Sequence, residues 1–307
     1  MPDSGQVAAS ETMRGEMATG EVPSRRMQRA EGTGRFSVKK TGSRSALEIL
    51  HESGAAKLRF PRQVRGADTL EAIVINTAGG MTGGDRFNWE IAAGPGTDVS
   101  ITTQANEKVY KASSGAADVS ISLRLERDSR VAWLPQETIL FQHAALTRKL
   151  DVEMAPGSEL LLCEAIVFGR HGHGEKFTQG LLRDRWRVRA GDTLVHAEEL
   201  YLEGDAGLAL GRAAVAGGAG AVATLIAIGG KSLFKLEGAR EIIASCKEVS
   251  GGVSVIRIGE NPGIDDSGTG KLLARLVAKD GYLLRKALVP LIGLLNGEAG
   301  LPKSWSL

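Results

Sequence analysis

The side chains with the clearest capacity for chemistry lie near the middle of the chain, where His171 and His173 are followed by Glu175. On an extended backbone, side chains at alternate positions point the same way, so both imidazoles and the carboxylate could face one metal ion. Two histidines alone make an incomplete site, and the neighbouring glycines favour a turn. Two interpretations stay open: the site of a metal-dependent hydrolase, or a surface turn with incidental histidines.

A glycine-rich segment, which reads NTAGGMTGGDRF from Asn76 to Phe87, is the second candidate. Its two glycine pairs permit positive φ angles and close backbone approach, so the segment could cradle an anion or contact a partner protein. It could equally be a tight connection between two strands, Ala72–Asn76 and Asn88–Ala92. A dinucleotide-binding loop is not expected, because the residues after the segment alternate like a strand and no helix follows.

A third segment, Gly268 to Lys271, superficially resembles a phosphate-binding loop. The motif requires a glycine where this chain has Asp265, and a serine or threonine where it has Leu272. We therefore expect no nucleotide hydrolysis. Motifs of serine hydrolases and zinc peptidases are not present in the sequence either, so we expect that the chain is not an enzyme.

The composition limits the class of partner. The chain has 307 residues, of which 42% are hydrophobic and 24% charged, and its formal net charge is +2. A net charge this small produces too weak an electrostatic field to favour nucleic acid or an anionic membrane as a partner. The two cysteines, Cys163 and Cys246, form no metal-binding pair or disulfide framework, and the first residues lack the apolar run of a signal peptide. We expect a soluble, cytoplasmic protein.

Alternating polarity is the dominant structural signal. From Ala117 to Leu125 every odd position is apolar and every even position polar, as in a strand with one face in the core. Similar patterns, separated by turn residues, predict further strands at 72–76, 88–92, 98–103, 149–154, 159–168, 183–189, 193–201, 221–228 and 252–258. The sequence therefore predicts a mainly β protein.

Helical patterns are confined to the C-terminal part. We predict short helices at 239–247, at 270–279 after a cap formed by Asp265, Asp266 and Ser267, and at 282–289, where Pro290 should end or kink the helix. Residues 1–34 are polar and lack periodicity, which predicts a disordered tail. Residues 35–307 are predicted to form a single β domain.

Four segments and a few C-terminal residues stand out in order along the chain. They are Gly79–Asp85 (GGMTGGD), Thr102–Tyr110 (TTQANEKVY), Trp133–Phe141 (WLPQETILF) and Gly169–Glu175 (GRHGHGE), followed by Leu284, Arg285, Pro302 and Trp305. These segments resemble signatures of the UreD (also called UreH) family of urease accessory proteins. Each motif alone is weak evidence for the family, but four motifs in the same order along the chain are specific to it. The resemblance covers about residues 35–307.

The resemblance implies two stacked β layers with a helix-like winding of strands, plus a few short helices near the C-terminus. It also implies a non-catalytic scaffold that binds a UreF homologue, which in turn binds the GTPase UreG, and that docks on apo-urease. Nickel would pass transiently through an interior channel towards the urease active site, with no tightly bound cofactor.

Matching the family motifs places Asp85, Thr102, Thr103, Glu137 and Glu175 near the expected nickel path. Weakly binding oxygen ligands of this kind could release a hydrated nickel ion again. His171 and His173 fall where the family pattern is loose, so the resemblance leaves their role open.

Overall fold

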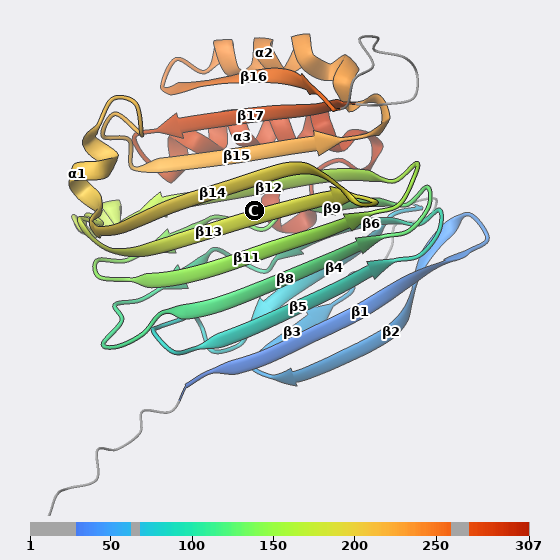
Figure 1. The fold of residues 1–307 in the computed structure, drawn as a ribbon, viewed down its shortest axis with the longest axis horizontal. Helices are drawn as coiled ribbons and strands as arrows, with labels where there is room; N and C mark the ends of the chain where they lie inside the picture. Colours follow the sequence, from blue (N-terminus) through green and yellow to red (C-terminus); the bar gives the residue numbers. More distant parts are fainter. Residues whose placement is uncertain (1–28, 63–67, 259–269, 307) are drawn as a thin grey trace, which may run out of the picture.

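A computed structural model describes residues 29–62, 68–258 and 270–306. Most of these residues lie in two β-sheets that stack face to face, with helices gathered at one end (Figure 1). The expected mainly β fold is therefore confirmed. Among the described residues, no helix is both long and apolar enough to cross a lipid bilayer.

The first sheet has seven strands in the order β14-β13-β11-β8-β5-β1-β2. In chain order these are β1 (Glu31–Thr41), β2 (Arg44–Gly54), β5 (Arg86–Ala93), β8 (Ala117–Leu125), β11 (Ala145–Met154), β13 (Gln179–Ala190) and β14 (Thr193–Asp205). Strand β1 begins at Glu31, inside the predicted tail, whereas residues 1–28 lie outside the described part of the chain.

The second sheet has ten strands, eight of them in the order β16-β17-β15-β12-β9-β6-β4-β3, while β10 pairs with both β12 and β7. Its strands are β3 (Ala56–Arg59), β4 (Leu70–Asn76), β6 (Asp98–Thr103), β7 (Glu107–Val109), β9 (Arg130–Trp133), β10 (Thr138–Leu140), β12 (Glu159–Phe168), β15 (Ala221–Ile228), β16 (Val249–Arg257) and β17 (Gly270–Ala278).

The chain winds between the two sheets like a solenoid. From β4 to β13, strands of the second sheet alternate along the chain with strands of the first, apart from the short strands β7 and β10. Successive turns stack in parallel, with β5, β8, β11 and β13 in one sheet and β4, β6, β9 and β12 in the other. The helix-like winding of strands is thus confirmed.

Strand β12 separates two apolar cores. Its even-numbered residues, such as Leu162 and Ile166, lie in the core between the sheets. Its odd-numbered residues, such as Cys163 and Ala165, lie in a second core on the outer face. A strand buried on both faces is expected to be apolar throughout, as this one nearly is.

The described residues also form the α-helices α1 (Ala206–Gly211), α2 (Leu236–Ser245) and α3 (Gly281–Asn296). Short 3₁₀ turns lie at His171–His173, Gly230–Lys235, Gly297–Ala299 and Lys303–Ser306. Helix α3 packs on the outer face of the second sheet, and α2 packs against α3 and β16 (Figure 1). The helix predicted at 239–247 is confirmed as α2, which begins three residues earlier.

One helix prediction was wrong. Residues 270–278 form strand β17, in which Leu272, Ala274 and Leu276 are buried between neighbouring strands. The proposed cap at 265–267 lies outside the described residues. The helix predicted at 282–289 is confirmed as part of α3. Pro290 does not end it: the proline is exposed, and the helix continues to Asn296 with Leu291 and Ile292 fully buried.

Candidate functional site

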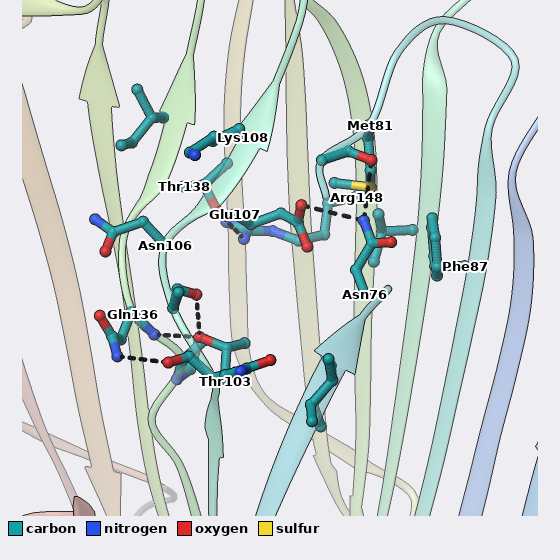
Figure 2. A pocket seen from close by; sticks show the side chains of 18 of the residues that line it. Asn76, Met81, Phe87, Thr103, Asn106, Glu107, Lys108, Gln136, Thr138 and Arg148 are labelled. Carbon is teal, nitrogen blue, oxygen red and sulfur yellow. Dashed lines mark hydrogen bonds between the residues drawn. The ribbon is translucent and has the colours of Figure 1, made fainter. Parts of the chain in front are cut away.

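Three of the signature segments meet at a cavity of about 730 Å³ between the sheets (Figure 2). The glycine-rich segment contributes Asn76 and 79–81, and the second segment contributes 103–108. The third contributes Trp133, Pro135, Gln136, Thr138 and Ile139. Strands β5, β8 and β11 of the first sheet form the opposite wall. Residues far apart in sequence are therefore brought together here by the winding of the chain.

The glycine-rich segment connects β4 of one sheet to β5 of the other, so it is a crossing between layers rather than a hairpin. It is fastened to β7 by backbone hydrogen bonds from the Met81 N–H to the Lys108 carbonyl and from the Tyr110 N–H to the Met81 carbonyl, both 2.7 Å. Gly80 has a φ of 139°, and a Cβ there would lie 2.4 Å from Cε2 of Tyr110. Only glycine allows this close approach.

Asp85, near the end of the glycine-rich segment, accepts hydrogen bonds from two backbone N–H groups. Its Oδ1 accepts a hydrogen bond from the Ala30 N–H at 2.8 Å, and its Oδ2 accepts one from the Thr82 N–H at 2.7 Å. The side chain is buried and is not among the residues that line the cavity. Asp85 therefore ties the loop to the start of β1.

Glu107 and Asn76 project into the cavity from β7 and β4 and contact one another (Figure 2). The Asn76 Nδ2 donates hydrogen bonds to Glu107 Oε1 at 3.2 Å and to the Gly80 carbonyl at 3.1 Å. Burial raises the pKa of Glu107 to about 7, against opposing effects of Asn76 and of Lys108. The cavity thus contains a carboxyl group that titrates near neutrality.

The inner wall carries a buried ion-pair network that joins the two sheets. Arg148 on β11 lies 2.5 Å from Asp184 Oδ2 and 2.5 Å from Glu164 Oε2, through Nη2 and Nη1 respectively. The indole of Trp133 donates to Glu164 Oε1 at 2.9 Å, and that of Trp186 donates to Asp184 Oδ1 at 3.0 Å. Arg148 and Glu164 both line the cavity.

Burial and neighbouring charges shift the titration of this network. Burial raises the pKa of Glu164 to about 7, although Arg148 lowers it. Burial alone would lower the pKa of Arg148, but the carboxylates of Asp184 and Glu164 raise it above its ordinary value. Arg148 therefore stays charged, whereas Glu164 titrates near neutrality.

The two predicted threonines differ in position. Thr103 lines the cavity, where its hydroxyl accepts from the Gln136 N–H and donates to the Ala105 carbonyl, both at 2.9 Å. Thr102 points away from the cavity and is buried against the C-terminal segment, with its Oγ1 at 3.0 Å from Ser304 Oγ.

Glu137 lies just behind the cavity wall. Its carboxylate, 1% exposed, is 3.1 Å from Arg285 Nη1 and accepts from Asn106 Nδ2 at 3.0 Å. Arg285 also stacks on the ring of Trp305, whose indole donates to the Leu134 carbonyl at 2.9 Å. The C-terminal signature residues therefore hold the third signature segment in place.

Glu175 lies elsewhere, beside a second cavity of about 610 Å³ that His171, Phe177 and Lys279 also line. It accepts a hydrogen bond from the Gln142 N–H at 2.6 Å and pairs with Arg170. These contacts lower its pKa, mainly through the backbone N–H. The structure therefore does not bring Glu175 together with the other predicted residues.

The histidine pair does not have the predicted extended backbone. His171 and His173 lie in a 3₁₀ turn, and His171 Nε2 is 3.0 Å from the Phe168 carbonyl oxygen. Among the described residues, no group of three or more His, Cys, Asp or Glu side chains is placed to hold a metal ion. With Glu175 engaged by Arg170, these three residues do not form the arrangement expected for the hydrolase.

The sequence interpretation missed Asn76, Glu107, Arg148 and Glu164 as cavity residues. A signal existed for Glu164, because a carboxylate inside the apolar run of β12 must be buried with a partner. Asn76 and Glu107 belong to recognised segments but have no distinctive spacing. Arg148 sits in an ordinary alternating strand.

Comparison with known proteins places the chain in a family. The family model described as UreD urease accessory protein matches residues 30–306. The urease accessory protein UreD of Mesorhizobium japonicum is 49% identical over 91% of this chain and 95% of its own length. UreD 1 of Brucella melitensis is 46% identical over 92% of this chain and 95% of its own length. The chain therefore belongs to the UreD family of urease accessory proteins.

Proposed function

We propose that this chain is a non-catalytic scaffold in urease maturation. It links apo-urease to a complex of UreF and UreG homologues and conducts nickel towards the urease active site. Membership of the UreD family supports the role in maturation. Both cysteines are free thiols, which supports a reducing compartment such as the cytoplasm.

The observation that carries the nickel-conducting role is the cavity between the sheets. It offers carboxylate, amide and hydroxyl groups from Glu107, Asn76, Gln136 and Thr103. Such oxygen ligands bind divalent nickel more weakly than thiolate or histidine clusters do, so an ion can enter and leave. Nickel is therefore cargo rather than a resident cofactor, and GTP is handled by the UreG homologue.

The five residues predicted from the family motifs have different tasks in this proposal. Thr103 contacts the passing ion, while Asp85, Thr102 and Glu137 hold the surrounding segments through their buried contacts. Glu175 acts at the second cavity, where it fixes the turn that carries Arg170.

A substitution at the cavity mouth tests the proposal. Ala105 is exposed and lines the cavity, so Ala105→Trp places a large side chain in the path. Ala197→Trp, at an exposed position on β14, is the matched control. Each variant is co-expressed with the urease subunits and the other accessory proteins, and urease activity and urease nickel content are measured.

We expect Ala105→Trp to lower activity and nickel content several-fold, and Ala197→Trp to leave both unchanged. Affinity purification of the complex is the second readout, because the UreF homologue and urease should still co-purify with Ala105→Trp. Full activation by Ala105→Trp would contradict passage through this cavity.

A further inference from the structure

The four signature segments all reach the surface where the chain crosses from the second sheet to the first. These crossings are residues 77–85, 110–116, 141–144 and 169–178, which join β4 to β5, β7 to β8, β10 to β11 and β12 to β13. Each signature segment contributes residues to one crossing. Because successive turns of the winding stack in parallel, the crossings follow one another along one end of the two sheets.

A row of contacts joins the four crossings. The Tyr110 hydroxyl donates to the Gly79 carbonyl at 3.1 Å, and the Tyr110 ring meets the Phe141 ring edge-on, with centroids 4.9 Å apart. The Arg170 guanidinium lies over the Phe141 ring, 4.5 Å from its centroid, and pairs with Glu175. We call these five residues the surface row.

The surface row does not belong to either apolar core. Gly79, Tyr110 and Arg170 are exposed, and Phe141 is half-buried. Ion pairs and cation–π contacts at exposed positions stabilise a fold only weakly, so stability alone does not account for the row. Tyrosine, phenylalanine and arginine are enriched at protein–protein interfaces, which favours a surface that binds a partner.

Positive charge without a partner borders the row. Lys111 and Lys176 are exposed in the second and fourth crossings, and neither forms an ion pair with a residue that the structure describes. The carboxylates of the crossings are already engaged. Asp85 is buried and accepts from two backbone N–H groups, and Glu175 pairs with Arg170. A face that presents carboxylates would therefore complement the row.

The arrangement of these groups favours a protein as the partner. Nucleic acids and anionic membranes are bound through many cations, and two free ammonium groups are few for that purpose. An apolar centre with a charged rim is the usual anatomy of a protein interface. The row also adjoins both cavities, because Gly79 lines the first, and Glu175 and Lys176 line the second.

We propose that the surface row is the docking surface for an acidic face of a partner protein. Tyr110 and Phe141 supply the apolar contact, and Lys111 and Lys176 pair with carboxylates of the partner. The inference rests on the linking role proposed above and assigns that role to a surface of this chain.

Charge reversal at the border of the row tests the docking surface. One tagged variant combines Lys111→Glu with Lys176→Glu, and the matched control combines Lys149→Glu with Lys247→Glu at exposed positions on β11 and after α2. Each chain is co-expressed with the UreF homologue, the UreG homologue and the urease subunits. Recovery of the UreF homologue and recovery of urease are quantified separately at low and at high salt.

We expect the Lys111 and Lys176 variant to recover one of these two proteins about tenfold less than wild type at low salt, and the control to recover both normally. The deficit should shrink at high salt, because screening weakens the wild-type contact, whereas a misfolded variant would be deficient at both salt concentrations. Equal recovery of both proteins by variant and control overturns the docking surface, also where the variant instead loses co-purifying nucleic acid.

The apolar part of the row has its own variant. Tyr110→Ser removes the exposed ring, and Tyr282→Ser, which removes an exposed ring on α3, is the control. We expect Tyr110→Ser to lower recovery of the same partner at both salt concentrations, with the control unchanged. Unfolding midpoints show whether Tyr110→Ser is folded; if it is not, the charge-reversal variant decides.

The same purifications separate this inference from the proposed function. If wild type recovers the UreF homologue and urease and the charge-reversal variant recovers both equally well, the docking surface is wrong while the linking role stands. If wild type recovers neither protein, the linking role is wrong, and the docking surface assigned to it is wrong as well.

Discussion

Arg285 on helix α3 pairs with the buried carboxylate of Glu137, 148 residues earlier in the chain. The same guanidinium donates to the Trp305 carbonyl and stacks on the Trp305 ring. Because Glu137 also accepts from Asn106, which lines the cavity, the pair connects the C-terminal segment to the cavity wall. The C-terminal residues thus support the site from outside it.

Replacement of Arg285 by glutamine should destabilise the protein. The buried Glu137 carboxylate would lose its ion-pair partner and retain the hydrogen bond from Asn106, and loss of one member of a buried pair costs roughly 3 kcal/mol. Chemical unfolding of wild type and Arg285→Gln measures the difference. Arg240→Gln is the control, because its exposed pair with Glu237 should contribute less than about 1 kcal/mol. Equal effects of the two substitutions would contradict a supporting role for Arg285.

Substitution of Arg148 should destabilise the protein more than substitution of Arg285. Arg148→Met leaves Glu164 and Asp184 buried without their cation, so we expect a loss of about 3–5 kcal/mol in the free energy of unfolding. Arg124→Met, which removes an exposed pair with Glu153, serves as the control. An Arg148→Met protein as stable as Arg124→Met would show that the network does not hold the two sheets together.

Gly80 should tolerate no side chain. A Cβ at this position would overlap the ring of Tyr110, and the φ of 139° is unfavourable for other residues. Gly80→Ala should therefore cost about 2–3 kcal/mol and lower urease activation by displacing β7. The control is Gly96→Ala, where φ is also positive but no atom lies within 4 Å of the added Cβ, so only about 1 kcal/mol is expected. Similar unfolding midpoints for the two variants would rule out the steric requirement.

The central strands could be predicted because a strand with one buried face alternates apolar and polar residues with a period of two. Strands β6, β8, β12 and β15 begin and end where the pattern predicts. Residues 270–278 show the limit of this reasoning. The spacing of their leucines suits one face of a helix as well as it suits a strand. Pairing with the neighbouring strands β15 and β16 makes the segment a strand.

The site was predictable only in part. Thr103 was found through a family motif and does line the cavity, but the motif does not distinguish it from Thr102, which faces Ser304. The contact between Arg148 and Glu164 could not be predicted, because it joins strands of different sheets. Which residues meet across the layers depends on the pitch of the strand winding, a non-local property that no short pattern records.

His196 gives the fold a dependence on pH that can be measured. Burial, together with the positive charges of Lys271, Arg275 and Arg187, lowers the pKa of His196 to about 4. Its Nδ1 lies 3.1 Å from Lys271 Nζ, and the nearest carboxylate, that of Glu198, is 3.8 Å from Nε2. The imidazole is therefore neutral in the folded protein, whereas the unfolded chain takes up a proton below about pH 6.5.

Because the folded pKa is the lower one, the contribution of His196 to stability is fully present above about pH 6.5 and is lost as the pH falls towards 4. We expect a loss of about 2 kcal/mol over this range that His196→Gln does not show, since glutamine cannot be protonated but can still accept from Lys271. Unfolding midpoints of wild type, His196→Gln and the exposed control His51→Gln are compared at pH 7.5 and pH 4.5. If wild type and His196→Gln lose equal stability between these two values, His196 is not the group responsible.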